Sequence, residues 1–194
     1  AAEQRNKYLG ATVALFVVLE VVAFVPGEKE IVNNRIVEAK CQQTCVFKEM
    51  SADKLASEIV SEYYVLNIID VRTPEEYEAY HLPLAINIPF DQMMERQYEP
   101  IFKQRLKTNV FYADSDTLVR MACLKAKYIG KSENYILKES AEEFRKMYFE
   151  AEPPPPDAPK SELELYTFRN VNAEKMNDLV DALKNIGAPV KREK

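Results

Sequence analysis

Short apolar runs alternate with amphipathic segments through the middle of the chain. Four of these runs have the length and composition of buried parallel strands, and they occupy residues 64–71, 85–89, 109–113 and 134–137. Capping residues or apolar residues at helical spacing mark helices that begin near residues 51, 73, 118 and 141. Strands that alternate with helices predict an α/β domain with a mainly parallel sheet over residues 51–150.

The longest apolar stretch lies near the start of the chain, at residues 8–25, and Glu20 is its only charged residue. A helix rises 1.5 Å per residue, so this stretch spans roughly 27 Å, close to the roughly 30 Å of a bilayer core. We therefore expect residues 1–27 to form a transmembrane anchor that ends at Pro26 and Gly27. A secretory signal peptide and a buried helix of a soluble protein are the alternatives.

The charges that flank this stretch predict its orientation. Arg5 and Lys7 precede it, so the positive-inside rule places the short N-terminus in the cytoplasm and the rest of the chain outside, in the periplasm. A carboxylate in lipid is costly. Glu20 therefore either reaches the headgroup region or pairs with another membrane subunit.

Residues 28–50 form a polar stalk that carries Cys41 and Cys45. Residues four apart on a helix have Cα atoms roughly 6 Å apart, which a disulfide can bridge. In an oxidising compartment we expect these two cysteines to be joined. The alternative is a redox-active thiol pair.

Residues 70–89 read DVRTPEEYEAYHLPLAINIP, and this segment closely resembles the rhodanese-like (sulfurtransferase) family. Members of that family show Asp-Val-Arg, a helix start at Pro-Glu-Glu, and His-Ile-Pro-Gly-Ala-Ile-Asn-Ile-Pro. The resemblance implies a three-layer α/β domain. It also implies that four residues set the framework near the active-site loop, namely Asp70, Arg72, Glu76 and His81. Two residues depart from the pattern, because Leu84 stands where the family usually has Gly and Tyr80 stands at another small position.

The resemblance also locates the reactive loop of the family. Active members carry a Cys directly after the central strand, and the loop amides that follow stabilise its thiolate and persulfide. Here that strand is followed by Ala113, Asp114, Ser115, Asp116, Thr117 and Leu118. Alanine has no nucleophile, and two aspartates put negative charge where an anionic substrate would sit. We therefore expect no persulfide transfer at this loop.

The rest of the composition excludes several other kinds of chemistry. A net charge of -5 argues against nucleic-acid binding. The single histidine, His81, and the absence of a Cys-x-x-Cys pair argue against a metal centre, and no glycine-rich phosphate loop occurs. We expect no cofactor and no metal, and we regard a small-molecule substrate as unsupported. Cys123 lies among apolar residues, as an inert core cysteine does.

Beyond the domain, residues 151–160 form a proline-rich spacer that we expect to be extended. Residues 161–194 form a tail, with an extended stretch over 161–168 and a helix over 172–186 that Asn172 caps. One face of that helix carries four apolar residues, Met176, Leu179, Val180 and Leu183. The helix docks either on its own domain or on a partner, and the spacer favours a partner.

Two classes of function follow from these features. The first is a membrane-anchored, catalytically inactive rhodanese-like protein that serves as an accessory or scaffolding subunit of a membrane protein complex. The second is a divergent sulfurtransferase or thiol redox protein that uses Cys41 with Cys45, or Cys123. We favour the first because the nucleophile position holds Ala113. A sensor that binds a small anion in the old pocket is a third possibility, which Asp114 and Asp116 disfavour.

Overall fold

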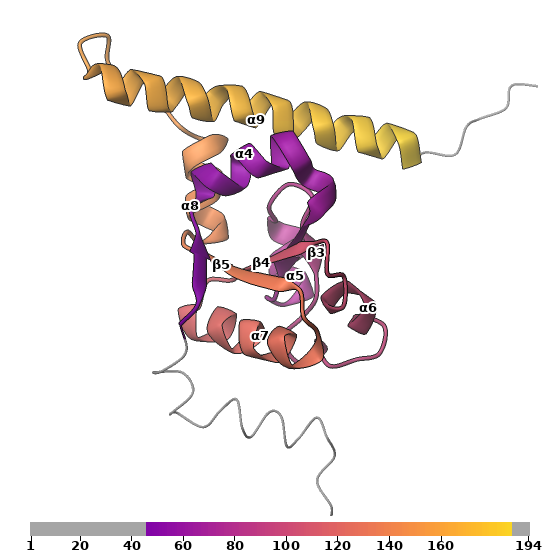
Figure 1. The fold of residues 1–194 in the computed structure, drawn as a ribbon. Coiled ribbons are helices and arrows are strands. Elements are labelled where there is room, and N and C mark those ends of the chain that lie inside the picture. The colour runs from indigo at the N-terminus through magenta and orange to yellow at the C-terminus, as the bar shows by residue number, and fades with distance from the viewer. Residues whose placement is uncertain (1–45, 188–194) are drawn as a thin grey trace, which may run out of the picture.

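A five-stranded parallel sheet forms the centre of the computed structural model, which describes residues 46–187 (Figure 1). The strand order is β1-β5-β4-β2-β3, and every neighbouring pair is parallel. The strands are β1 (Lys48–Met50), β2 (Leu66–Asp70), β3 (Ile86–Asn87), β4 (Thr108–Tyr112) and β5 (Glu133–Leu137). The predicted α/β domain with a parallel sheet is therefore confirmed.

Helices cover both faces of the sheet, so the domain has three layers (Figure 1). One face packs against α4 (Ala52–Glu62) and α8 (Ala141–Tyr148), and α9 (Lys160–Gly187) packs on the outer side of these two helices. The other packs against α6 (Glu99–Phe102) and α7 (Asp116–Ile129). Two short helices, η1 (Tyr63–Val65) and α5 (Pro74–Ala79), flank β2.

Alternation along the strands divides the core between the two faces. In β4, Val110 and Tyr112 contribute to the core under α4 and α8, whereas Phe111 contributes to the core under α7. Strand β2 is buried along its whole length, as expected for a central parallel strand. The apolar runs of the sequence therefore predict the central strands correctly.

Side-chain caps explain where the helices begin. The hydroxyl of Thr73 accepts from the amide of Glu76, and the Glu76 carboxylate accepts from the amide of Thr73, which forms a capping box at α5. Ser140 and Glu143 form the same motif at α8. Ser51 caps α4, as the sequence predicts.

Strand β1 lies inside the segment that the sequence assigns to the stalk. It pairs in register with β5, from Lys48 opposite Tyr135 to Met50 opposite Leu137. The Met50 side chain is fully buried, and its carbonyl accepts from the amide of Lys138. The folded domain therefore begins before Ser51, and the last residues of the expected stalk belong to the sheet.

The predicted structure of the tail is wrong in one respect. Residues 160–187 form a single helix, so the expected extended stretch over 161–168 does not exist and Asn172 is not a cap. The Asn172 side chain instead donates to the carbonyl of Phe168, one turn earlier in the same helix. The amides of Glu162 and Leu163 donate to the carbonyl of Pro159, which marks the true start of the helix.

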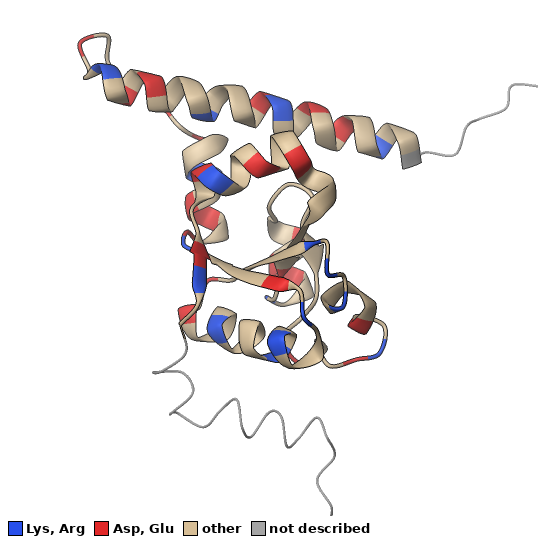
Figure 2. Cartoon of the chain, in the orientation of Figure 1, with Lys and Arg blue, Asp and Glu red and all other residues tan. Residues whose placement is uncertain are grey.

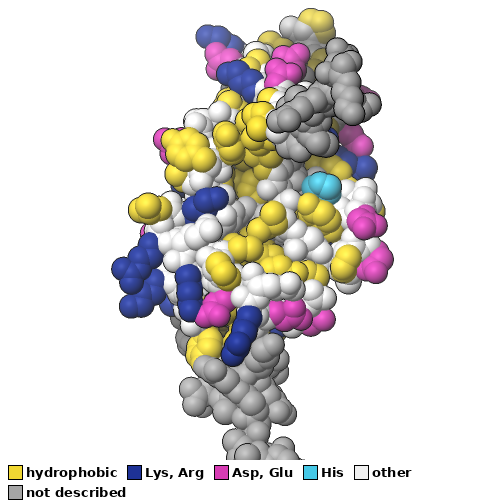
Figure 3. Space-filling view, turned by 90° about the vertical axis from the view of Figure 1, so that its right-hand side faces the viewer, with side chains coloured by type: hydrophobic (Ala, Val, Ile, Leu, Met, Phe, Trp, Pro, Cys, Tyr) yellow, Lys and Arg dark blue, Asp and Glu magenta, His cyan; other side chains and the backbone are white. Residues whose placement is uncertain are grey.

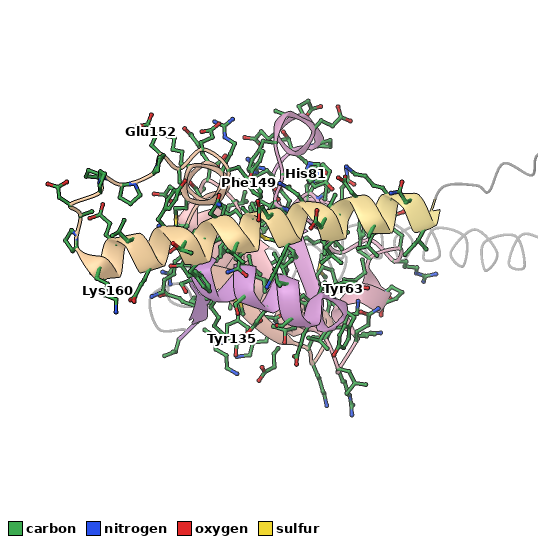
Figure 4. All side chains as sticks on the ribbon, turned by 90° about the horizontal axis from the view of Figure 1, so that it is seen from above. Tyr63, His81, Tyr135, Phe149, Glu152 and Lys160 are labelled. Atoms are coloured by element: carbon green, nitrogen blue, oxygen red, sulfur yellow. The ribbon has the colours of Figure 1, made fainter. Side chains whose placement is uncertain are left out.

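Helix α9 docks on its own domain, where it crosses α4 and contacts α8 (Figure 4). Arg169 forms a two-pronged ion pair with Asp53 of α4, with distances of 2.8 and 3.0 Å. Met176 is fully buried against the domain, so it contacts its own chain and not a partner. Of the other three residues of that face, Leu179, Val180 and Leu183 are each half-buried.

The sequence expectations about the membrane fall outside the described residues. The apolar stretch over 8–25 with Glu20, and the pair Cys41 and Cys45, all precede residue 46. Within residues 46–187 no helix has the length and apolar character needed to cross a bilayer.

Candidate functional site

The loop after β4 lies beside the turn after β2, at the carboxyl edge of the sheet. The two strands are neighbours in register, with Asp70 opposite Tyr112. Residues that lie two positions beyond these partners therefore also come together, and Arg72 Nη1 lies 3.4 Å from Asp114 Oδ2. This edge of the sheet is where α/β folds carry their ligand sites.

A buried ion pair anchors the turn after β2. The Arg72 side chain donates to Asp70 through Nη2 at 2.7 Å and through Nε at 3.1 Å, and the Arg72 amide donates to the same carboxylate at 2.9 Å. Nη2 also donates to the carbonyl of Tyr80 at 2.7 Å. Burial alone would lower the pKa of Arg72, but the bonds and charge of Asp70 outweigh it and leave that pKa raised.

The loop after β4 is short and open. Only Ala113, Asp114 and Ser115 separate β4 from α7, because Ser115 is already the cap of that helix. Its hydroxyl accepts from the amide of Leu118 at 3.4 Å. Ala113 is 9% exposed, whereas the side chain of Asp114 is 54% exposed.

The remaining loop residues form the first turn of α7. Asp116 pairs with Arg120 one turn later at 2.7 Å, and Thr117 is exposed. The carbonyl of Ser115 accepts from the amide of Val119. The loop therefore continues directly into the helix, and the Leu118 amide is already bonded to the Ser115 hydroxyl.

A hollow of about 300 Å³ lies between the two turns and α8. It is lined by Arg72, Glu76, Ala79, Tyr80, Asp114, Glu142 and Arg145. Three carboxylates face two guanidinium groups there, so the lining carries no excess of positive charge. An anion would gain little in such a hollow, because each cation already has a carboxylate neighbour.

Tyr80, one of the two departures from the family pattern, helps to close this hollow. Its ring lies under the guanidinium group of Arg145, with 5.5 Å between group and ring centre. Its hydroxyl is buried and has no hydrogen-bond partner within residues 46–187. Burial raises the pKa of Tyr80 to about 12.

Leu84, the other departure, has a backbone conformation that glycine favours. Its φ angle is 61°, in the left-handed region that costs other residues roughly 1–2 kcal/mol. The glycine that the family usually places here has no such cost. The fold has therefore kept the turn and accepted the strain of a leucine.

His81 packs against Tyr77, four residues earlier in the chain. Its Nδ1 lies 2.9 Å from the carbonyl of Tyr77, and its ring stacks on the Tyr77 ring at 4.0 Å. The Tyr77 hydroxyl donates to the carbonyl of Ala85, so the pair closes this turn. Figure 3 shows the histidine at the surface beside apolar side chains.

Cys123 lies in the core under α7 and does not line the hollow. It is 5% exposed, and its Sγ lies 3.9 Å from the carbonyl of Tyr135. Burial raises the pKa of its thiol to about 12. A thiol of this kind is almost fully protonated near pH 7 and is a poor nucleophile.

Two charged residues that line the hollow were not foreseen from the sequence. Glu142 and Arg145 come from α8, and only the packing of that helix brings them beside Arg72. Tyr112 contacts the same region, since its hydroxyl accepts from the amide of Leu82 and its ring lies under Arg72. In the part of the chain that the structure describes, no three His, Cys, Asp or Glu side chains are arranged to hold a metal ion.

A family model, the rhodanese-like domain, matches residues 51–147, which is half of the chain. None of the curated proteins matches it. Among solved structures the chain is similar to the single-domain sulfurtransferase RDL2 of Saccharomyces cerevisiae, at 22% identity over 52% of this chain and 90% of that one, with a TM-score of 0.44. The BH2092 protein of Bacillus halodurans is 24% identical over 51% and 72% of the two chains, with a TM-score of 0.44. A thiosulfate sulfurtransferase of Pseudomonas aeruginosa is 23% identical over 60% of this chain and 21% of that one, with a TM-score of 0.43.

Proposed function

The chain belongs to the rhodanese-like domain family, and from that premise we propose that it is a catalytically inactive, membrane-anchored member that serves as a subunit of a membrane protein complex. In this proposal the domain contributes a rigid surface and no chemical step. Residues 8–25 hold it at the membrane, and the domain lies on the extracytoplasmic side.

The observation that carries the loss of catalysis is the contact between Arg72 and Asp114. The family pattern places a nucleophilic Cys at position 113, where this chain has Ala. The next residue puts a carboxylate 3.4 Å from the Arg72 guanidinium group. That guanidinium group is thus already paired twice, with Asp70 and with Asp114, and an anionic sulfur substrate would meet a carboxylate beside it.

The alternative of cysteine-based chemistry gains no support from Cys123. Its thiol is buried, its pKa is raised to about 12, and it does not line the hollow beside Arg72. Cys41 and Cys45 precede the described residues, so the assay below has to include them.

The catalytic half of the proposal is tested with thiosulfate as sulfur donor and cyanide as acceptor. The full chain is expected to produce thiocyanate no faster than the buffer does. The variant Ala113→Cys is expected to stay inactive, because Asp114 and the short capped loop remain.

Turnover by the unchanged chain would overturn this half of the proposal. The variants Cys123→Ser and Cys41→Ser with Cys45→Ser would then identify the thiol that carries the sulfur. Turnover by Ala113→Cys alone would show that the loop still forms an anion site, which contradicts the effect that we assign to Asp114.

The accessory half is tested by gentle detergent extraction of the tagged full chain, followed by native mass determination. We expect membrane proteins to co-purify in a fixed ratio. A species that contains copies of this chain and nothing else would overturn the role as a subunit of a larger complex.

A further inference from the structure

Helix α9 is much longer than α4, the helix on which most of its packing depends. Its 28 residues extend over about 42 Å, whereas the 11 residues of α4 beneath it extend over about 17 Å. Both ends of α9 project past the domain (Figure 1). An amphipathic helix gains its stability from packing, so the projecting ends are expected to have a packing partner.

A strip of residues along one flank of α9 is available for such packing. We name it the α9 strip, and it consists of Phe168, Val171, Lys175, Leu179, Ala182 and Ile186. The spacing of three or four residues places all six on one side of the helix, next to the side that Met176 buries. Phe168 is 38% exposed, Val171 is 39% exposed and Ile186 is 80% exposed, whereas Leu179 is half-buried against the domain and forms the inner edge of the strip.

Acidic and basic residues are distributed along the whole of α9 (Figure 2), and some of them form ion pairs. Lys160 pairs with Glu164, Arg169 pairs with Asp53, and Lys184 pairs with Asp181. Lys175 in the strip and Asp178 at its edge are exposed and have no ion-pair partner within residues 46–187. A partner that covers the strip thus has to offer an acid to Lys175 and a base to Asp178.

We propose that the α9 strip binds the α9 strip of a second copy of this chain in antiparallel orientation. Three pairs then form around one two-fold axis: Phe168 with Ile186, Val171 with Ala182, and Lys175 with Asp178. All three are centred on the same turn of the helix, around residues 176 and 177. Each pair occurs twice, as an interface with two-fold symmetry requires.

The charge pattern favours a second copy over an unrelated helix. The strip carries Lys175 and its edge carries Asp178. In an antiparallel pair of copies, Lys175 of each helix therefore faces Asp178 of the other. Phe168 and Val171 of each copy then meet Ile186 and Ala182 of the other, so the projecting C-terminal end of each helix is covered. One helix per subunit makes a small interface, and we therefore expect weak association that depends on the protein concentration.

The test compares charge-reversal variants of the full chain, solubilised in a non-ionic detergent, by sedimentation equilibrium over a range of concentrations. The unchanged chain is expected to double in mass as its concentration rises. Lys175→Glu places two acids together at each contact, and Asp178→Lys places two bases together, so each variant is expected to stay monomeric. The double variant K175E/D178K restores both pairs and is expected to dimerise again.

A mixture of the two single variants gives the sharpest result. In an antiparallel pair, the glutamate introduced at position 175 of one chain would face the lysine introduced at position 178 of the other. The native Asp178 and Lys175 would face each other at the second contact. The mixture is therefore expected to form a heterodimer although neither variant dimerises alone. A parallel pairing would not place these positions together and would not give this rescue.

The control is the double variant D181K/K184E, which reverses a pair that lies off the strip and should leave the mass unchanged. A chain that stays monomeric at every concentration would overturn the proposal, and the strip would then be a site for a helix of another protein. Dimers that persist unchanged in both single variants would overturn it too, because they would have to form through other residues.

Discussion

The turn after β2 and the loop after β4 follow neighbouring strands at the same edge of the sheet. The carboxylate of the turn is buried and fully bonded, whereas the carboxylate of the loop is exposed. In the turn, Asp70 has no exposed surface and receives three donor groups from Arg72. In the loop, Asp114 keeps 54% of its side-chain surface exposed and receives one long contact from the same arginine. One guanidinium group thus binds one carboxylate as part of the fold and the other at the surface.

This difference separates the framework of the family from its chemistry. The buried pair holds the turn before α5 and the carbonyl of Tyr80, so its loss would damage the fold. The loop after β4 holds little beyond its own helix cap. Substitutions in the loop are therefore expected to leave the domain intact.

The largest effect on stability is expected from a substitution of Asp70, the buried carboxylate. Asp70→Asn removes the charge that balances Arg72 and leaves a buried guanidinium group without a full partner. We expect the free energy of unfolding to fall by roughly 3–5 kcal/mol. Urea denaturation followed by circular dichroism measures this, and a loss below about 1 kcal/mol would show that the pair is not a structural element.

A third carboxylate and arginine pair extends the comparison to intermediate burial. The side chain of Asp53 is 34% exposed, and Arg169 holds it to α9. Allowing for that exposure, we expect Asp53→Asn to lower the free energy of unfolding by about 1 kcal/mol at pH 7. Glu174→Gln, which changes an exposed acid on the same helix, should have almost no effect.

The same pair predicts a dependence on pH. The bond from Arg169 lowers the pKa of Asp53, against the opposing effect of burial and with help from Tyr148. A lowered pKa adds stability above the ordinary value and loses it as the pH falls through the folded value. The difference between the unchanged chain and Asp53→Asn should therefore shrink below about pH 4, and a difference that grows on acidification would contradict it.

The Tyr80 hydroxyl, in the hollow between the two regions, is expected to destabilise the fold. Tyr80→Phe removes a buried hydroxyl that has no partner in the described chain. We expect this variant to gain about 1 kcal/mol, because an unsatisfied buried group is costly. Tyr77→Phe is the matched control and should lose about that amount, since its hydroxyl donates to Ala85.

The smallest effect on stability is expected from a substitution of Asp114, the exposed carboxylate. Asp114→Asn weakens a single contact of 3.4 Å to an arginine that Asp70 already neutralises. We expect a change within about 0.5 kcal/mol in the urea midpoint experiment. A loss comparable to that of Asp70→Asn would remove the distinction between framework and loop.

The central part of the fold could be predicted from local patterns. Residues 64–71 and 109–113 are apolar over most of their length because both strands are covered on two faces, and the caps at Thr73 and Ser51 read directly from the sequence. Strand β1 could not be found this way. Three residues are too few to show a period, and only pairing with a distant strand makes them a strand.

The prediction for the tail, residues 161–194, was wrong for a different reason. Alternating Glu and Leu at residues 162–165 is compatible with an extended segment, and Asn172 resembles a helix cap. Packing on α4 overrides both signals, because Ala173 and Met176 bury their side chains only if the helix continues through this region. The position of Asn172 within the helix therefore reflects tertiary structure.

The sequence predicted where the candidate site lies in the fold, but not which side chains come into contact there. The resemblance places Ala113 and Asp114 directly after the central strand, and the structure has them there. Their contacts with Arg72, and the approach of Arg145 from α8, depend on how strands and helices pack. A pattern within one segment carries no information about these contacts.

The order of the strands also bears on how the chain folds as it is made. Strand β1 leads the described domain, yet it lies at one edge of the sheet and its one neighbour there is β5, the last strand. Lys48 and its ion-pair partner Glu133 are 85 positions apart. During synthesis β1 leaves the ribosome first and waits for β5 to follow. A nascent chain that stalls before Glu133 has a first strand without a neighbour, so the sheet closes with its last strand and does not grow outward from its first.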